Sequence, residues 1–101
     1  MAIRRPKARN YRLSLDDETA KLQTALRRRV LKDKPKEPIS LAQLRDQHDL
    51  SYRELALIID ARSGSHAYRL CTGDRRPLWD YACHIAGVLK GVVSLETLTE
   101  R

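Results

Sequence analysis

Apolar residues recur at helical spacing over most of this chain. The first such segment predicts a helix over about residues 15–32, with Ser14 as a candidate N-cap, an acidic first turn and a basic last turn. One face of this helix carries four apolar residues: Leu15, Leu22, Leu26 and Val30. Just before it, "YRLSL" (11–15) alternates apolar and polar residues and predicts a short strand.

A polar segment with two prolines, "KDKPKEP" (32–38), predicts a linker, and four short helical patterns follow it. Ser40 caps "LAQLRDQHD" and Ser51 caps "YRELALIID", where Glu54 completes a capping box. Pro77 starts "LWDYACHIAGVLK", Gly91 ends it, and "SLETL" predicts one last turn. The residues predicted to face a core are Leu41, Leu44, Leu55, Ala56, Ile58, Ile59, Leu78, Ala82, Ile85, Ala86 and Leu89.

The remaining pattern, "RSGSHAYRLCTGDRRP" (62–77), is polar but amphipathic. A helix over 64–72 places Ala67, Leu70 and Cys71 on its inner side. Its outer side then carries Ser65, Arg69 and Thr72, with Arg62 just ahead of the first turn and His66 and Tyr68 on the flanks. Two short helices joined by a tight turn are typical of a helix-turn-helix unit.

We therefore predict an all-α protein whose helix-turn-helix bundle of four to five helices spans residues 39–101. A flexible basic arm (1–10) and a unit containing the strand, the first helix and the proline-containing linker (11–38) precede it. We expect the helix at 15–32 to pack on the bundle or on a partner subunit.

Charge is unevenly distributed along the chain, whose net charge is +7. Residues 1–36 hold 12 Lys and Arg against 4 Asp and Glu, which gives +8, whereas residues 37–101 hold 8 against 9, which gives −1. A basic segment beside a balanced domain favours a polyanionic partner, through counterion release. Charge that only keeps the chain soluble is the alternative interpretation.

Composition argues against several other classes of protein. With 101 residues the chain has little room for a catalytic cleft, so we expect no enzyme, cofactor or small-molecule ligand. Cys71 and Cys83 lack the paired spacing of zinc sites and are interpreted as small core residues, and Trp79 as a core or half-buried anchor. Neither a membrane span nor a signal peptide is visible, which indicates the cytoplasm.

Residues 40–98 resemble the phage-repressor and Cro type of helix-turn-helix domain. The resemblance rests on "LSYRELALIIDA" (50–61), "TGDRRP" (72–77) and "VLKGVVSLETL" (88–98). It implies a bundle that binds DNA operators, usually as a dimer. Tyr52 stands where that family often has Gln, and Asp60 where it often has Gly, although Asp tolerates a left-handed turn. The turn is one residue longer than is usual in that family, so the register of base-contacting residues can differ by one.

A weaker resemblance concerns residues 11–26, "YRLSLDDETAKLQTAL", which look like the opening of a ribbon-helix-helix protein. In that family two strands pair across a dimer and enter the major groove. Pro35 and Pro38 interrupt the second helix that this interpretation would need.

The resemblance implies a transcriptional regulator, most naturally a repressor of phage, plasmid or bacterial origin on a two-fold-symmetric operator. The expected base contacts are Arg62, Ser63, Ser65, His66 and Arg69. The expected phosphate contacts are Ser51, Tyr52, Arg53, Thr72, Arg75, Arg76, Arg4, Arg5, Lys7 and Arg9. The expected homodimer contacts are Leu15, Leu22, Leu26 and Val30, or Val92, Val93, Leu95 and Leu98. An antitoxin-like or adaptor-like interaction module and an RNA-binding regulator are the alternatives.

Overall fold

Six helices make up most of residues 12–99, the part of the chain that the computed structural model describes. In chain order they are α1 (Asp17–Lys32), α2 (Leu41–His48), α3 (Tyr52–Ile58), α4 (Gly64–Thr72), α5 (Trp79–Val88) and α6 (Leu95–Thr99). No strand forms within these residues, so the predicted all-α class is confirmed. The predicted arm at 1–10 lies outside the described residues.

Serine side chains begin three consecutive helices. The Ser51 hydroxyl accepts a hydrogen bond from the Glu54 N–H at 3.1 Å, and the Glu54 carboxylate accepts one from the Ser51 N–H at 2.9 Å. Ser40 takes part in the same reciprocal pairing at α2. Ser63 caps α4 by accepting from the His66 N–H at 3.2 Å. These bonds satisfy N–H groups that have no partner within a helix, which fixes where each helix begins.

The first helix begins two residues later than predicted. Its N-cap is Asp16, whose Oδ1 accepts from the Thr19 N–H at 2.7 Å, and not Ser14. Aspartate is as favourable an N-cap as serine, so the pattern alone did not separate the two positions. Leu15 therefore precedes the helix instead of lying on its apolar face.

The predicted strand at 11–15 does not form in residues 12–15, and Tyr11 lies outside the described residues. The Leu13 N–H donates to Asp60 Oδ1 at 3.5 Å, so this backbone meets a side chain instead of a second strand. A lone extended segment has no stability without such a neighbour, and residues 12–99 supply none.

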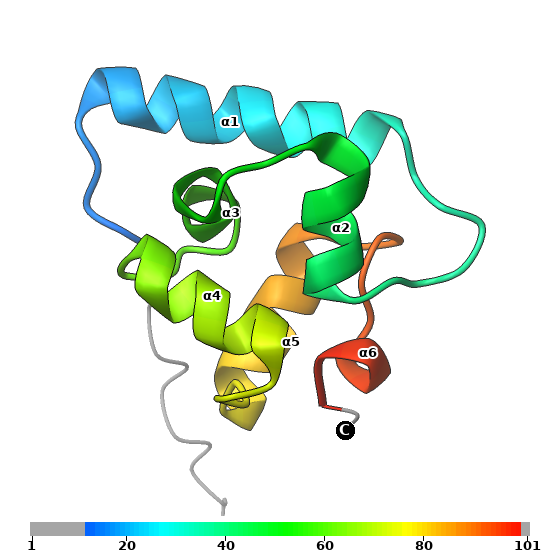
Figure 1. Cartoon of the computed structure of the whole chain (residues 1–101). Helices are drawn as coiled ribbons and strands as arrows, with labels where there is room; N and C mark the ends of the chain where they lie inside the picture. Colours follow the sequence, from blue (N-terminus) through cyan, green and yellow to red (C-terminus); the bar gives the residue numbers. More distant parts are fainter. Residues whose placement is uncertain (1–11, 100–101) are drawn as a thin grey trace, which may run out of the picture.

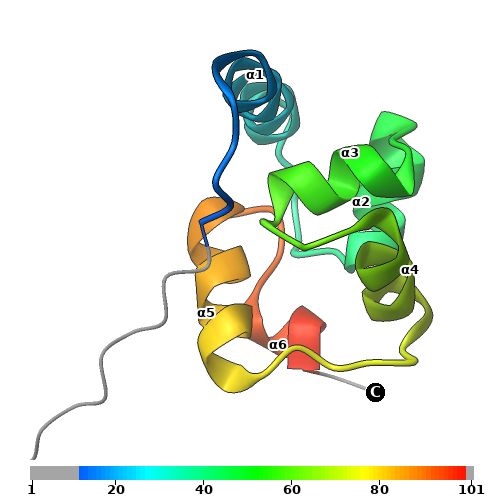
Figure 2. The same ribbon diagram turned by 90° about the vertical axis from the view of Figure 1, so that its left-hand side faces the viewer.

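One hydrophobic core joins residues from all six helices. The largest fully buried side chains are Leu44, Leu55, Ile58, Ile59, Ile85, Leu89, Val30 and Val92. The core positions predicted on α2 and α3 are all buried. A short amphipathic helix has one apolar side, and this side packs against the core. Figures 1 and 2 show α1 lying across α3 on one side of the bundle.

Polar side chains of α1 also attach it to the bundle. Gln23 Nε2 donates to the Leu57 carbonyl at 2.7 Å, and Arg27 Nε donates to the Ile58 carbonyl at 3.0 Å. Arg29 Nη2 donates to the carbonyl of His48, at the end of α2, at 2.6 Å. The last carbonyls of a helix have no partner within it, so α1 supplies donors to those of His48 and Ile58 and a second donor to that of Leu57, which also accepts from the Asp60 N–H. α1 thus packs on the bundle, one of the two arrangements expected for it.

Several apolar residues predicted to lie in the core are exposed instead. Leu78 and Trp79 are 66% and 65% exposed, because α5 begins only at Trp79 and its first turn extends beyond the core. Cys83 is also exposed, whereas Cys71 is half-buried and burial raises the pKa of its thiol. Leu22, which was predicted to lie on the apolar face of the first helix and to be a dimer contact, is 47% exposed.

Most residues of the two predicted dimer contacts are buried within the chain itself. The buried members of the two sets are Leu26, Val30, Val92, Val93 and Leu98. Neither set offers the continuous apolar face that the sequence pattern indicated, because α1 and the segment after α5 each cover part of one core. Within residues 12–99, no helix has the length and apolar character needed to cross a membrane.

Candidate nucleic-acid interface

A tight turn at residues 59–63 joins α3 to α4 and sets their crossing. The Ala61 N–H donates to the Ala56 carbonyl at 2.8 Å, and the Asp60 N–H donates to the Leu57 carbonyl at 3.4 Å. This pair of bonds is a Schellman motif, which needs a left-handed residue at its centre. Asp60 fills that position with φ of 56°, as predicted from the sequence.

The first residue of α4 lies against the backbone at the start of α3. A Cβ atom at Gly64 would stand 3.3 Å from the Arg53 backbone nitrogen. The glycine therefore permits a close approach of the two helices.

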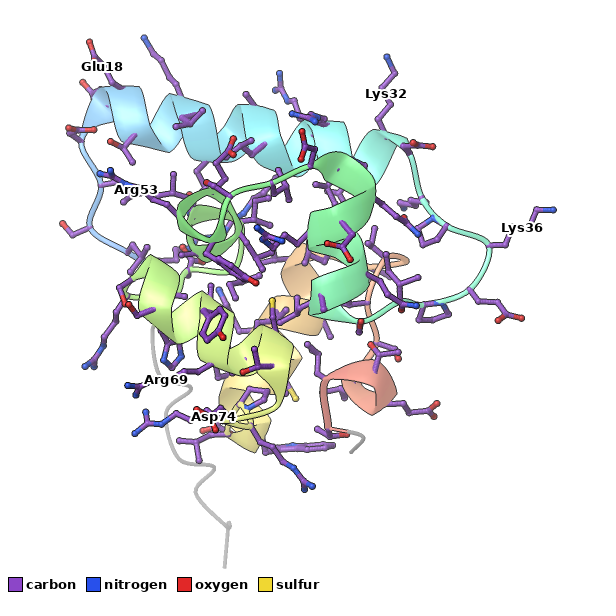
Figure 3. All side chains as sticks on the ribbon, in the orientation of Figure 1. Glu18, Lys32, Lys36, Arg53, Arg69 and Asp74 are labelled. Carbon is purple, nitrogen blue, oxygen red and sulfur yellow. The ribbon has the colours of Figure 1, made fainter. Side chains whose placement is uncertain are left out.

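α4 has the two-sided character predicted for it. Ala67 is fully buried, and Leu70 and Cys71 pack partly against the core. The exposed residues of α4 and of the turn before it include Arg62, Ser63, Ser65, Tyr68, Arg69 and Thr72. In Figure 3 Arg69 projects outward from α4 on the side of the molecule away from α1. The helix thus presents polar side chains to solvent, while its apolar side is packed against the core.

Three arginines surround the flank of α4 at His66. Partial burial lowers the pKa of this imidazole, and the charges of Arg75, Arg62 and Arg69 lower it further. None of these three guanidinium groups forms a salt bridge with a carboxylate of residues 12–99. Asp74 is the one acidic residue between 62 and 79. The surface beside α4 is therefore positive and largely uncompensated.

The predicted phosphate contacts lie at both ends of the helix-turn-helix unit. Ser51 and Arg53 are exposed at the start of α3, and Arg75 and Arg76 are exposed in the loop after α4. The remaining described members are Tyr52, which is half-buried, and Thr72, which is exposed. Arg4, Arg5, Lys7 and Arg9 lie outside the described residues.

The flanking residues of α4 each meet an aromatic ring. The Tyr68 ring lies edge-on to Tyr52, with centroids 5.1 Å apart, and the His66 ring lies 6.1 Å from that of Tyr81. Tyr81 is buried, and its hydroxyl donates to the Ile59 carbonyl at 2.8 Å. The sequence placed His66 and Tyr68 on the flanks but did not identify these ring contacts, because their partners come from other helices.

Asp60 is a second feature that the sequence did not reveal. Its buried carboxylate accepts hydrogen bonds from Gln23 Nε2 at 2.8 Å, Arg27 Nη2 at 2.8 Å and His84 Nε2 at 2.7 Å. Burial raises the pKa of Asp60, but the hydrogen bonds from His84, Gln23 and Arg27 outweigh it and leave the pKa below its ordinary value. An aspartate at the end of the apolar run "LALIID" is the signal that could have indicated a buried acceptor.

The segment before α1 runs past the start of α4. Leu13 and Leu15 line a shallow hollow together with Arg53, Arg62 and Ser63. The Leu13 N–H also lies 3.5 Å from Asp60 Oδ1, so this segment contacts the turn that precedes α4. Leu13 and Leu15 therefore lie beside the turn that leads into α4.

Comparison with known proteins finds no matching family model, no significantly similar curated protein and no significantly similar solved structure.

Proposed function

We propose that this chain is a sequence-specific double-stranded DNA-binding regulator of transcription, a repressor of phage, plasmid or bacterial origin that acts in the cytoplasm on the nucleoid. α4 enters the major groove of a two-fold-symmetric operator. The bound protein then blocks access of the polymerase.

One observation carries this proposal: the uncompensated positive charge beside the exposed side of α4. Arg62, Arg69 and Arg75 act together on His66 and have no salt bridge within residues 12–99. Guanidinium groups without a carboxylate partner are available to phosphates and to guanine edges. The major groove, about 12 Å wide, admits one helix whose outer side chains can hydrogen-bond.

The base-reading and positioning roles divide along the unit. Arg69, Ser65 and Arg62 are the main candidates for base edges, since arginine pairs bidentately with guanine. Arg53 at the start of α3 and the Arg75–Arg76 pair after α4 hold phosphates on either side, which fixes the register of α4. The four cations before residue 10 follow the DNA backbone or a minor groove. They are near enough in the chain to do so, because Leu13 and Leu15 line a hollow at the start of α4.

A homodimer completes this proposal. One reading helix covers a few base pairs, too few to distinguish an operator from the non-specific sites of a genome. A two-fold pair of α4 helices doubles the site, with half-sites about 34 Å apart. Since Leu26, Val30, Val92 and Val93 are buried, the contact between subunits uses residues on the outside of the bundle.

Selection of bound duplexes from random DNA tests the proposal. We expect enrichment of one sequence with inverted half-sites, and an affinity for it about 10³-fold or more above that for random duplex. Duplex RNA of the same sequence serves as a competitor and is expected to compete weakly, because its major groove is too deep and narrow for side chains to read. Equal affinity for every duplex sequence contradicts the proposal.

A protein-interaction module is the second candidate, and the exposed pair Leu78 and Trp79 favours it. Both side chains are about two-thirds exposed at the start of α5. Tryptophan and other aromatic side chains are enriched in the centres of protein interfaces. If the selection enriches no sequence, this candidate takes the place of the first.

A further inference from the structure

Tyr68 is a large aromatic side chain on the flank of α4, next to its proposed reading side. It is 49% exposed and lies one helical turn after Ser65 and one before Thr72. About half of the surface of this ring is not covered by the fold, so it can be buried against a ligand. The exposed half of the ring is available to a group of a bound ligand.

Contacts with α3 and α2 restrict the movement of the Tyr68 ring. Tyr52 contacts it edge-on at a centroid distance of 5.1 Å, and Tyr52 is itself covered by Arg45, whose guanidinium carbon lies 4.0 Å from the ring centre. A cation over one face and an aromatic edge on another leave these two rings little freedom. The apolar surface is therefore organised before any ligand arrives.

The two rings form one side of a shallow hollow between α3 and α4. Its lining is completed by Gly64, Ser65 and Arg69. Gly64 has no side chain to fill the space, while Ser65 and Arg69 add a hydroxyl and a guanidinium. The hollow thus combines an apolar side with a hydrogen-bonding side, at the position from which α4 would face base edges.

We infer that this hollow receives the 5-methyl group of a thymine in each half-site, and that Tyr68 is a specificity-determining residue for it. The inference rests on the proposed function. Among the groups that bases present in the major groove, only the thymine methyl is apolar. Arg69 beside it is then placed to pair with a neighbouring guanine.

The methyl group itself can be removed without changing base pairing, which makes the inference testable with the full chain. In the selected duplex, each thymine is replaced singly by deoxyuridine and the affinity is measured by fluorescence anisotropy. We expect one thymine in each half-site whose replacement weakens binding about fourfold, the effect of one buried methyl group. Replacement of thymines elsewhere is expected to change little.

Variants of Tyr68 link the effect to this ring. With Tyr68→Ala the affinities for the thymine and deoxyuridine duplexes are expected to become equal, whereas Tyr68→Phe keeps the ring and the fourfold difference. A merely structural role would lower the affinity for both duplexes by the same factor and leave their ratio unchanged. Circular dichroism verifies that both variants remain helical.

Two results overturn the inference while the proposed function stands. One is sequence-specific binding in which no deoxyuridine replacement weakens the complex. The other is a fourfold difference that persists in Tyr68→Ala. Absence of any sequence preference is a separate outcome, which removes the proposed function and this inference with it.

Discussion

His84 Nε2 lies 2.7 Å from Asp60 Oδ2, and the same oxygen accepts a hydrogen bond from Arg27 at 2.8 Å. These two contacts bring α5 and α1 onto the turn that precedes α4. The orientation of α4 therefore depends on a carboxylate that is almost completely buried.

We expect Asp60→Ala to lower the free energy of unfolding by about 3 kcal/mol. Removing one member of a buried ion pair costs about 3–5 kcal/mol, and the lower end applies because Arg27 and His84 are partly exposed. Urea denaturation followed by circular dichroism measures the change. Asp46→Ala is the matched control, since its weak contact to Arg45 is largely exposed and its removal is expected to cost under about 0.5 kcal/mol.

The stability of the wild-type chain is expected to fall in acid with a contribution from Asp60. The hydrogen bonds that outweigh burial place the pKa of this carboxyl below its ordinary value of 3.8. The unfolded chain therefore binds the proton first, so this stabilisation is present above 3.8 and is lost as the pH falls through the folded-state pKa. Asp60→Asn should remove that part of the pH dependence of unfolding. An identical profile in the variant would assign the acid sensitivity to other carboxyls.

Arg69→Ala is expected to cost about 1–3 kcal/mol on the selected operator and little on random duplex. The reason is that a base contact contributes only where its guanine is present. Arg28→Ala on the outer side of α1 removes the same charge and is the control, with a small reduction in affinity for both duplexes. Equal reductions on operator and random duplex for Arg69→Ala would make it a phosphate contact.

Affinity for DNA is expected to rise as the pH falls through the pKa that His66 has in the complex. Burial and the charges of Arg75, Arg62 and Arg69 keep the pKa of this imidazole below 6.5 in the free protein. Phosphates near these arginines would offset their charge and raise that pKa, so the complex takes up a proton. Anisotropy titrations between about pH 5 and 8 measure the slope, which His66→Gln should remove.

Deletion of residues 2–9 is expected to weaken binding to every duplex and to reduce the dependence on salt. Each phosphate that the protein no longer neutralises lowers the slope of log affinity against log salt concentration by about 0.9. The deletion takes away Arg4, Arg5, Lys7 and Arg9, which are four positive charges within six residues that include no acidic residue. A slope that does not change would show that these residues do not bind DNA.

The sequence was sufficient for features that depend on neighbouring residues. The caps Ser40 and Ser51, the limits of α4 and the left-handed Asp60 are set by hydrogen bonds over three to five positions, and each was predicted correctly. Local patterns also indicated the buried sides of α2 and α3, because in these short helices one side is consistently apolar.

Features set by distant parts of the chain were not predictable in this way. Trp79 has the composition of an anchor, yet α5 begins beyond the edge of the core and leaves it exposed. The contacts of Asp60 with Gln23, Arg27 and His84 join residues 24 to 37 positions apart. The spacing of residues along one helix does not show which other helix will pack against its end.

The carbonyl groups that α1 covers have a consequence for how this small protein opens. If α1 detached alone, the carbonyls of His48, Leu57 and Ile58 would be deprived of the donors supplied by Arg29, Gln23 and Arg27. Buried apolar groups of α3 would be uncovered in the same event, so the cost approaches that of global unfolding. Amide hydrogen exchange in α1 and α3 is then expected to occur through one shared opening, with similar protection in both helices.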